Sequence, residues 1–321
     1  MNGPPAITVA VVSWNTRDLL RRCLTSLRPE AGRCEVWVVD NASSDGSAEL
    51  VRSEFPWARL IGSDENLGFG RAVNLVAAQT TTPWLVVANA DVALHAGALD
   101  ALLAAADADA GAGAVAPRLV LPDGSTQHSV FSFPTLTQAL VISSGIGSLV
   151  PALADRFLLL GRTDLRRPRV VPWAVAALLL VRRAAWDAVD GFDERQWMYA
   201  EDLDLGWRLG RAGWSTRFEP RAVVEHASAA ATEQAWRGGE KVERWQRETY
   251  AWMRRRLGRG RTLGSALLQA GGQAARWLLF VALARVAPRF EPRRDSARWW
   301  LRLHLAALRP AGWGRLPQGC E

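Results

Sequence analysis

The sequence groups three carboxylates, Glu201, Asp202 and Asp204, in one short window between an aromatic run and a helical pattern. Neighbouring carboxylates raise each other's pKa, and a carboxylate at the mouth of a pocket can act as the general base that deprotonates a hydroxyl group. The alternative is an acidic helix N-terminus, because carboxylates are stabilised at the positive end of a helix dipole. The window alone does not separate these interpretations, so the surrounding elements must decide between them.

Polar side chains also follow four apolar runs in the first third of the chain. The runs at residues 7–13, 35–39, 58–61 and 84–88 predict buried strands, and helical patterns separate them. Strands that alternate with helices imply a mostly parallel sheet with helices on both faces, and such sheets bind ligands beyond the carboxyl ends of their strands. The polar residues at those ends are Ser13, Asn15, Asp40, Asn41, Asn66 and Asp91.

The remainder of the chain predicts elements on either side of the carboxylate window. Strands are predicted at residues 115–121, 170–181 and 215–224, and helices at 184–189, from the window to about 212, and at 232–256. The strand at 215–224 leads directly into Glu225 and His226. Residues 131–160 fit either a loop over the site or short helices.

Charge is distributed unevenly along the 321 residues. Residues 250–321 hold 14 arginines against three carboxylates, a net of +11, while the whole chain carries +7, so residues 1–249 carry −4. A basic tail suits an anionic surface, either lipid or nucleic acid. The apolar stretch at 263–286 is interrupted by Gln269 and Arg276, which favours a helix lying in a membrane interface over one that spans the bilayer. The alternative is a helical cap packed on the core.

The cysteines and the N-terminus bear on the cellular compartment. The chain has three cysteines, an odd number without metal-like spacing, which is typical of a reducing compartment. Cys23 lies in an apolar helical pattern and is expected to be a core residue. Residues 1–6 do not begin a secretory signal pattern, so we expect a cytoplasmic protein.

Taken in order, the motifs resemble those of family 2 glycosyltransferases, and most closely the bacterial rhamnosyltransferase-like branch that builds cell-surface glycans. The resemblance covers residues 7–226. The matching motifs are Val11-Val-Ser13-Trp-Asn15, Val38-Val-Asp40-Asn41-Ala-Ser43-Ser-Asp45-Gly46, Asn66-Leu-Gly68-Phe-Gly70, Asn89-Ala-Asp91-Val, Gly191-Phe192-Asp193-Glu194, the carboxylate window and Val224-Glu225-His226. Their order and spacing are more specific than any one of them.

The resemblance implies an α/β protein of the GT-A type, with a mostly parallel sheet flanked by helices. The charge and the apolar pattern of the last residues add a C-terminal helical basic tail, which carries no motif of the family. The glycosyltransferase domain would cover residues 1–230, with a nucleotide-binding half at about 1–120 and an acceptor half at about 121–230. Residues 231–321 would form a helical, basic region that associates with a membrane.

The resemblance also implies an inverting, metal-dependent transfer of rhamnose or a similar sugar from a dTDP- or UDP-linked donor. The implied nucleotide-binding residues are Ser13, Asn15, Asp40, Asn66, Gly68 and Gly70. Asp40 would read the base, since a carboxylate can accept the imino N–H of uracil or thymine. The alternative roles are a turn cap for Asp40 and backbone freedom at a helix start for the two glycines.

The implied cofactor is Mg²⁺ or Mn²⁺, with Asp91 as its main ligand, because a departing diphosphate needs its charge neutralised by a hard cation. His226 would be a further ligand or a phosphate contact; a structural histidine is the alternative. Ala90 stands where this family often has a proline, and Ala176 stands where its members often have a glycine.

The implied catalytic base is Asp202, with Glu201 as the next candidate, while Asp193 and Trp197 would contact the acceptor. Asp204 and Arg208 have the spacing of an ion pair on one helix face. The acceptor would be a glycan or a lipid-linked molecule at the inner face of the plasma membrane, and an anionic membrane surface, not nucleic acid, would be the partner of the tail.

Two other functions remain open from the residues alone. A dinucleotide-dependent oxidoreductase is suggested by Asp40 after the second strand, but the turn at Ser13-Trp14-Asn15 lacks the glycine-rich fingerprint of that class. A non-catalytic protein that binds a glycan or a nucleotide on the same scaffold is the other alternative.

Overall fold

The computed structural model describes residues 6–145, 165–227 and 240–308. Contacts between Cα atoms divide them into two compact units. The first unit holds residues 6–131 and 165–227, and the second holds residues 132–145 and 240–308.

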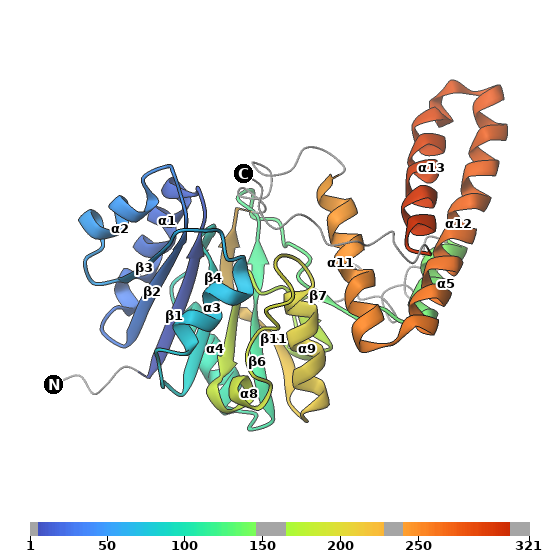
Figure 1. Cartoon of the computed structure of the whole chain (residues 1–321). Helices are drawn as coiled ribbons and strands as arrows, with labels where there is room; N and C mark the ends of the chain where they lie inside the picture. Colours follow the sequence, from blue (N-terminus) through green and yellow to red (C-terminus); the bar gives the residue numbers. More distant parts are fainter. Residues whose placement is uncertain (1–5, 146–164, 228–239, 309–321) are drawn as a thin grey trace. The chain divides into compact units, whose positions relative to one another are not determined.

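Within the described residues, the first unit is built on a nine-stranded sheet in the order β3-β2-β1-β4-β10-β6-β11-β5, with β8 paired to β11 (Figure 1). Its strands are β1 (Ile7–Ser13), β2 (Cys34–Asn41), β3 (Arg59–Ser63), β4 (Trp84–Asn89), β5 (Val92–Leu94), β6 (Ala112–Val120), β8 (Arg169–Val171), β10 (Leu178–Arg182) and β11 (Ser215–His226). The four strands from β3 to β4 are parallel, whereas β10 is antiparallel to both β4 and β6. The predicted α/β class is confirmed, and the sheet is mixed because β10 enters it in the opposite direction.

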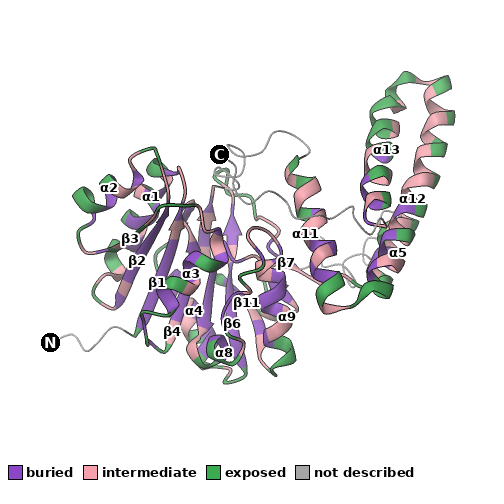
Figure 2. Cartoon of the chain, in the orientation of Figure 1, coloured by how far each residue is buried: buried purple, intermediate pink, exposed green. Residues whose placement is uncertain are grey.

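Helices cover both faces of this sheet, as the alternating pattern predicts. They are α1 (Arg17–Leu27), α2 (Ser47–Glu54), α3 (Phe69–Ala77), α4 (Ala98–Asp107), α8 (Arg183–Ala188) and α9 (Glu201–Arg211), with a short 3-10 turn at Arg28–Glu30. Alternate strand residues enter two separate cores: Val9 and Val11 pack with α1, α2 and α4, and Ala10 packs with α3, α8 and α9. Figure 2 shows the central strands β1, β2 and β6 as almost entirely buried, whereas the edge strand β3 has no buried residue.

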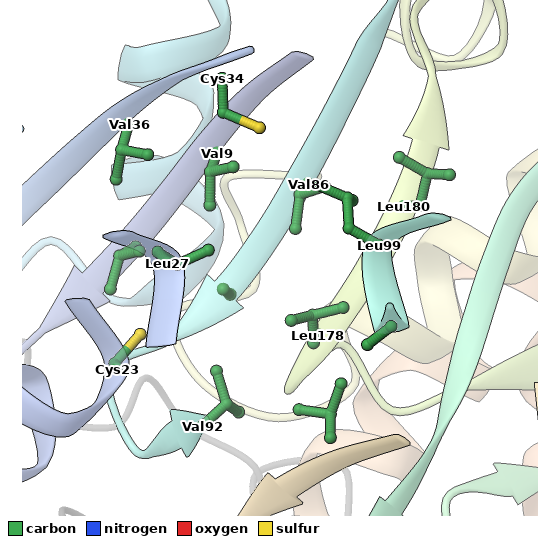
Figure 3. Packing of buried hydrophobic residues seen from close by; sticks show 14 of the residues in the cluster. Val9, Cys23, Leu27, Cys34, Val36, Val86, Val92, Leu99, Leu178 and Leu180 are labelled. Carbon is green, nitrogen blue, oxygen red and sulfur yellow. The ribbon is translucent and has the colours of Figure 1, made fainter. Parts of the chain in front are cut away.

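The first of these cores holds two thiols. Figure 3 shows Cys34 of β2 near Val9, and Cys23 of α1 in another part of the same cluster, which also includes apolar side chains of β4, β10 and α4. Cys23 is fully buried and free, so the prediction that it is a core residue is confirmed. Burial raises the pKa of both thiols to about 12, which makes them unreactive at neutral pH.

The predicted single strand at residues 170–181 is wrong, because the chain divides it into β8, β9 (Trp173–Ala174) and β10. Pro172 cannot donate a ladder hydrogen bond, and it lies between β8 and β9. β9 pairs instead with β7 (Val130–Phe131), and Phe131 stacks on Trp173 at 4.9 Å. The short strand β5 was not predicted either, because three residues are too few to show an alternation of apolar and polar side chains.

The second unit is helical. It contains α5 (Leu136–Ser144), α11 (Glu240–Arg256), α12 (Arg259–Val286), a 3-10 turn at Pro288–Phe290 and α13 (Glu291–Ala306). The predicted helix at 232–256 corresponds to α11, and its residues 232–239 lie outside the described residues. Of the open segment at 131–160, the described part ends at residue 145 and includes α5.

Buried polar groups join α11, α12 and α13 within this unit. The hydroxyl of Tyr250 lies 3.0 Å from His304 Nδ1. The side-chain amide of Gln269 donates a hydrogen bond of 3.0 Å to the same hydroxyl. Burial lowers the pKa of His304 to about 4, so the ring is neutral at pH 7 and can accept the hydrogen bond of Tyr250. Among the described helices, α12 alone has the length and apolar composition that crossing a membrane requires.

Candidate active site

The carboxyl ends of the parallel strands bring the predicted polar residues to one edge of the sheet. Ser13 on β1 is paired in register with Asp40 on β2, and Asp40 with Gly62 on β3. Val12 is paired with Asn89, two residues before Asp91. The expectation that these strand ends meet at a common edge is therefore confirmed.

Asp40 and Asn41 present buried oxygens at this edge. Asp40 is 5% exposed, and its Oδ2 accepts a hydrogen bond of 3.2 Å from the backbone N–H of Ser43. Its Oδ1 and the Oδ1 of Asn41 have no hydrogen-bond partner among the described residues. A buried acceptor without a donor costs free energy. This carboxylate thus caps a turn through one oxygen and leaves the other available as an acceptor.

Ser13 and Asn15 shape the loop beside Asp40. The hydroxyl of Ser13 lies 3.1 Å from the hydroxyl of Thr16. Asn15 Oδ1 accepts a hydrogen bond of 2.8 Å from the backbone N–H of Ser44. Asn15 has φ of 50°, a left-handed conformation that asparagine tolerates better than most residues. Both side chains are engaged within the loops that follow β1 and β2.

The loop at residues 66–70 lies against the segment before α9. Trp197 donates from Nε1 to the carbonyl of Asn66 over 3.0 Å, and Asn41 Nδ2 donates to the carbonyl of Gly68 over 3.3 Å. A Cβ on Gly68 would lie 2.1 Å from the carbonyl oxygen of Trp197, and one on Gly70 would lie 3.0 Å from the Cβ of Phe192. Gly68 is therefore required for this close approach, whereas a Cβ on Gly70 would need Phe192 to shift by a few tenths of an ångström. Trp197, the predicted acceptor residue, also contacts the predicted nucleotide loop.

Asp91 and His226 lie side by side in a buried position. The distance between Asp91 Oδ1 and His226 Nε2 is 3.2 Å, and the two side chains are each 8% exposed. Asp91 Oδ1 accepts no hydrogen bond among the described residues, and His226 Nδ1 lies 2.8 Å from Gln127 Oε1. β11 brings His226 to this place, and the N–H of Ala227 donates to the carbonyl of Asp91 over 2.9 Å.

This pair suits a divalent cation that is also bound by phosphate oxygens. One carboxylate and one imidazole are donors that Mn²⁺ and related ions accept, and an orphaned carboxylate oxygen is an available ligand atom. No group of three or more His, Cys, Asp or Glu side chains with metal-site geometry occurs in the part of the chain that the structure describes. The protein itself would thus supply two ligands and leave the remaining positions open.

Asp202 is a half-buried carboxylate at the start of α9. Burial raises its pKa to about 6, while hydrogen bonds from the backbone N–H groups of Leu203 and Ala176 oppose that shift. The N–H of Leu203 donates to Oδ1 over 2.8 Å, and that of Ala176 donates to Oδ2 over 3.4 Å. A carboxylate with this pKa is mostly ionised at pH 7 and can still bind a proton readily, as a general base requires.

A short stretch of backbone joins Asp202 to the tip of β4. The backbone N–H of Ala176 donates a hydrogen bond to the carboxylate of Asp202. The carbonyl of the next residue, Ala177, accepts a hydrogen bond of 2.9 Å from the N–H of Asn89. Asp91 follows Asn89 by two residues. The structure therefore brings the predicted base and the predicted metal ligand to the same end of the β4–β10 pair.

The other carboxylates have structural contacts. Asp204 is buried and pairs with Arg208 at 2.6 Å, which confirms the predicted ion pair on α9. Arg195 binds Asp193 through both carboxylate oxygens, at 2.8 and 2.6 Å. Glu201, the alternative base, is half-buried at the first position of α9.

Two residues of this region were missed at the sequence level. Gln127 contacts His226, and Asn74 of α3 binds the backbone of Phe192 through both its amide oxygen and its nitrogen, at 3.0 and 2.9 Å. Neither residue lies in a motif or at a strand end, so the sequence carried no signal for them.

The mixed sheet, with polar residues at the carboxyl ends of its parallel strands, has the GT-A fold. The same fold occurs in the mannosyltransferase PcManGT from Pyrobaculum calidifontis, solved with GDP-Man and Mn²⁺, with a TM-score of 0.59 and 18% identity over 95% of this chain and 87% of that one.

Sequence comparison gives the family. A profile described as Glycosyl transferase family 2 matches residues 8–141, and one described as Glycosyl transferase family group 2 matches residues 127–311. The N-acetylglucosaminyl-diphospho-decaprenol L-rhamnosyltransferase of Mycobacterium tuberculosis is 37% identical over 242 residues, which cover 70% of this chain and 77% of that protein. Pre-mycofactocin glycosyltransferase of the same organism is 31% identical over 68% of this chain and 42% of its own length.

This chain belongs to glycosyltransferase family 2 and is a rhamnosyltransferase-like glycosyltransferase. The predicted enzyme class is confirmed, and the oxidoreductase alternative is wrong.

Proposed function

We propose that the protein is an inverting, metal-dependent glycosyltransferase that transfers rhamnose or a similar sugar from a nucleotide-diphosphate donor to a lipid-linked glycan acceptor. The observation that carries this proposal is the link between Asp202 and the strand end before Asp91, through the Ala176–Ala177 peptide. This link connects Asp202, a carboxylate suited to take a proton, to Asp91, a carboxylate suited to bind a cation. Such a cation would in turn bind the diphosphate.

The donor would lie along the sheet edge. The free Oδ1 of Asp40 is suited to accept the imino N–H of a uracil or thymine ring, which favours UDP or dTDP donors. The loop that contains Asn66, Gly68 and Gly70 borders Asn41 and would line the same cleft, with Ser13 and Asn15 shaping its opposite wall.

Asp91 and His226 would hold a Mg²⁺ or Mn²⁺ ion. When bound, the ion supplies positive charge that stabilises the diphosphate as it departs. The PcManGT structure contains Mn²⁺ in a protein of the same fold.

The transfer would be a single displacement. The acceptor hydroxyl oxygen forms a bond to the anomeric carbon while the bond from that carbon to the diphosphate oxygen breaks, and the bonding electrons leave with the diphosphate. Asp202 takes the hydroxyl proton, and attack opposite to the leaving group inverts the anomeric configuration. Glu201 is the other candidate for the base, and Asp193 and Trp197 are candidates for acceptor contacts.

The acceptor is proposed from the rhamnosyltransferase relative, whose name specifies a decaprenol-linked N-acetylglucosaminyl diphosphate. The helical second unit supports a lipid-linked acceptor, because α12 and α13 combine exposed leucines with arginines and tryptophans. We therefore assign the protein to the cytoplasmic side of the plasma membrane, with residues 1–230 as the catalytic domain and 231–321 as the membrane-associating region.

The test is a product assay with the full-length protein. Polyprenyl-diphosphate-linked N-acetylglucosamine would be incubated with Mn²⁺ and either dTDP-rhamnose or a UDP-sugar, and products would be read by mass spectrometry and by NMR of the anomeric configuration. We expect addition of one deoxyhexose with inversion, and loss of the product in Asp202→Asn. Product formation by Asp202→Asn and Glu201→Gln at the wild-type rate would contradict the proposed base, and retention of configuration would contradict the single displacement.

A further inference from the structure

We propose that Gln127 is a positioning residue that holds His226 in the form protonated on Nδ1, so that Nε2 is the atom presented to the cation beside Asp91. This inference rests on the metal dependence proposed above and adds a residue to it. It follows from the contacts on the two sides of the imidazole ring.

The first contact determines where the ring proton lies. His226 Nδ1 is 2.8 Å from Gln127 Oε1. An amide oxygen can only accept a hydrogen bond, so the neutral ring must donate from Nδ1, and Nε2 keeps its lone pair. A partner that fixes the non-ligating nitrogen in this way is a common feature of histidines that bind metals.

The second contact shows where the lone pair is needed. Nε2 lies 3.2 Å from Asp91 Oδ1, yet that oxygen accepts no hydrogen bond among the described residues. Two acceptor atoms at this distance repel each other unless a metal cation or a proton lies between them. At this spacing both atoms would be able to bind one hard cation.

The backbone of Gln127 is fixed to the strands that carry the site. Its N–H donates to the carbonyl of Leu119 over 2.9 Å, and Thr126 forms a bridge with Val120. Val120 is paired in register with Glu225, the neighbour of His226. The β6–β11 pairing thus sets the position of both partners, and the amide side chain reaches the ring from a rigid support.

Mn²⁺ affinity tests the proposal. Free Mn²⁺ would be measured by electron paramagnetic resonance during titration of the full-length protein in the presence of UDP or dTDP. Gln127→Leu removes the acceptor, and we expect it to weaken Mn²⁺ binding by about 10–100-fold, as losses of such partners do. Gln127→Glu keeps an acceptor and should restore affinity to within a few-fold of wild type. Gln79→Leu, at an exposed glutamine of the first unit, is the matched control.

The ring tautomer gives a second readout, measured with Mg²⁺ and the nucleotide present so that a cation offsets the repulsion between Nε2 and Asp91 Oδ1. Long-range ¹H–¹⁵N spectra of ¹⁵N-histidine protein, with His226 assigned by His226→Asn, should show the Nδ1-protonated form in the wild type and a tautomer mixture in Gln127→Leu. Thermal denaturation of each variant checks that it is folded.

The outcomes separate this inference from the proposed function. If the wild type binds Mn²⁺, Asp91→Asn loses it and Gln127→Leu binds like the wild type with an unchanged tautomer, Gln127 has no positioning role and the inference is overturned. If the wild type binds no Mn²⁺ with either nucleotide, the proposed metal and the ligand role of His226 are both wrong. A wild-type ring protonated on Nε2 would overturn the inference whatever the metal result.

Discussion

The carboxylate of Asp202 should control the acid side of the pH–rate profile. Burial raises its pKa to about 6, and a general base works only when it is ionised. We expect kcat/KM to fall below pH 6 and to reach about a tenth of its plateau at pH 5, because one pH unit below the pKa about 10% of the carboxylate is ionised. An unshifted aspartate would place this limb near pH 4. The measurement is kcat/KM from pH 4.5 to 8 at fixed ionic strength.

Glu201→Gln is the control for this assignment, because Glu201 is the adjacent carboxylate. The variant should keep the acid limb at about pH 6, whereas Asp202→Asn should lower kcat by roughly 10²–10⁴-fold, the usual contribution of a general base. If the rate of Glu201→Gln no longer fell below pH 6, Glu201 and not Asp202 would be the group that takes the proton.

At the residue scale, the sequence could predict those site residues that occupy strand ends. Ser13, Asp40 and Asp91 follow apolar runs, and the parallel arrangement of β1, β2 and β4 is enough to bring them together. Gln127 and Asn74 could not be found in this way, since their partners lie 99 and 118 residues away in the chain. A contact of that kind depends on tertiary packing, which no local pattern encodes.

At the scale of elements, the loop before α3 and the segment before α9 should keep a fixed position relative to each other, because they are in direct contact. Gly68 has φ of 78° and ψ of 176°, a region open almost only to glycine, and an added Cβ would lie 2.1 Å from the carbonyl oxygen of Trp197. We expect Gly68→Ala to separate the two segments and to lower kcat/KM by roughly 100-fold, as displacements of about 1 Å at a site can do. Nucleotide affinity, measured by calorimetry, should fall as well.

Gly258→Ala is the matched control for the backbone conformation. Gly258 has φ of 88° and ψ of 163°, yet nothing lies within 4 Å of the position that an added Cβ would take. Its substitution should cost about 1–3 kcal/mol of backbone strain without an effect on nucleotide binding. Equal effects of the two substitutions on nucleotide affinity would show that the contact with Trp197 is not what matters.

The elements that the sequence predicted well were those long enough to show a full repeat of apolar and polar residues. α1 and α9 each have an apolar face long enough to read, and both occur as expected. The run at 170–181 is apolar throughout, so its composition could not show that the chain turns at Val175–Ala177 and leaves β9 to pair with β7. The break depends on Pro172 and on the available strand edges, which are properties of the folded sheet.

At the scale of the whole molecule, the separation of charge suggests distinct roles for the two ends of the chain. Residues 1–249 carry −4 and residues 250–321 carry +11. A chain with this distribution can attach to an anionic surface through its tail while the acidic remainder stays in solution. The exposed leucines of α12, with Leu278 at 60% and Leu279 at 55% exposure, would add an apolar component to such an attachment.

Neutralising exposed arginines on α13 should release the protein from anionic vesicles. Arg293, Arg298 and Arg302 are exposed, and each basic residue near such a surface contributes about 1 kcal/mol. The triple change to glutamine should therefore weaken binding to phosphatidylglycerol vesicles by on the order of 100-fold, measured by co-sedimentation in about 0.1 M salt.

A second triple variant separates the position of these charges from their number. Arg52, Arg59 and Arg211 are exposed arginines of the first unit, and their change to glutamine gives a protein of equal net charge. If both triple variants lose binding equally, net charge alone attracts the protein to the vesicles. If the α13 variant binds like the wild type, this helix is not the attachment surface.

The apolar part of the attachment should persist when salt screens the arginines. Leu278 and Leu279 are exposed on α12, and the double change to asparagine should weaken the binding that remains at about 0.5 M salt, because salt screens charge but not the burial of apolar surface. Co-sedimentation of the wild type and the double variant at the two salt concentrations measures this difference. Equal binding of the two proteins at high salt would show that these leucines stay out of the lipid.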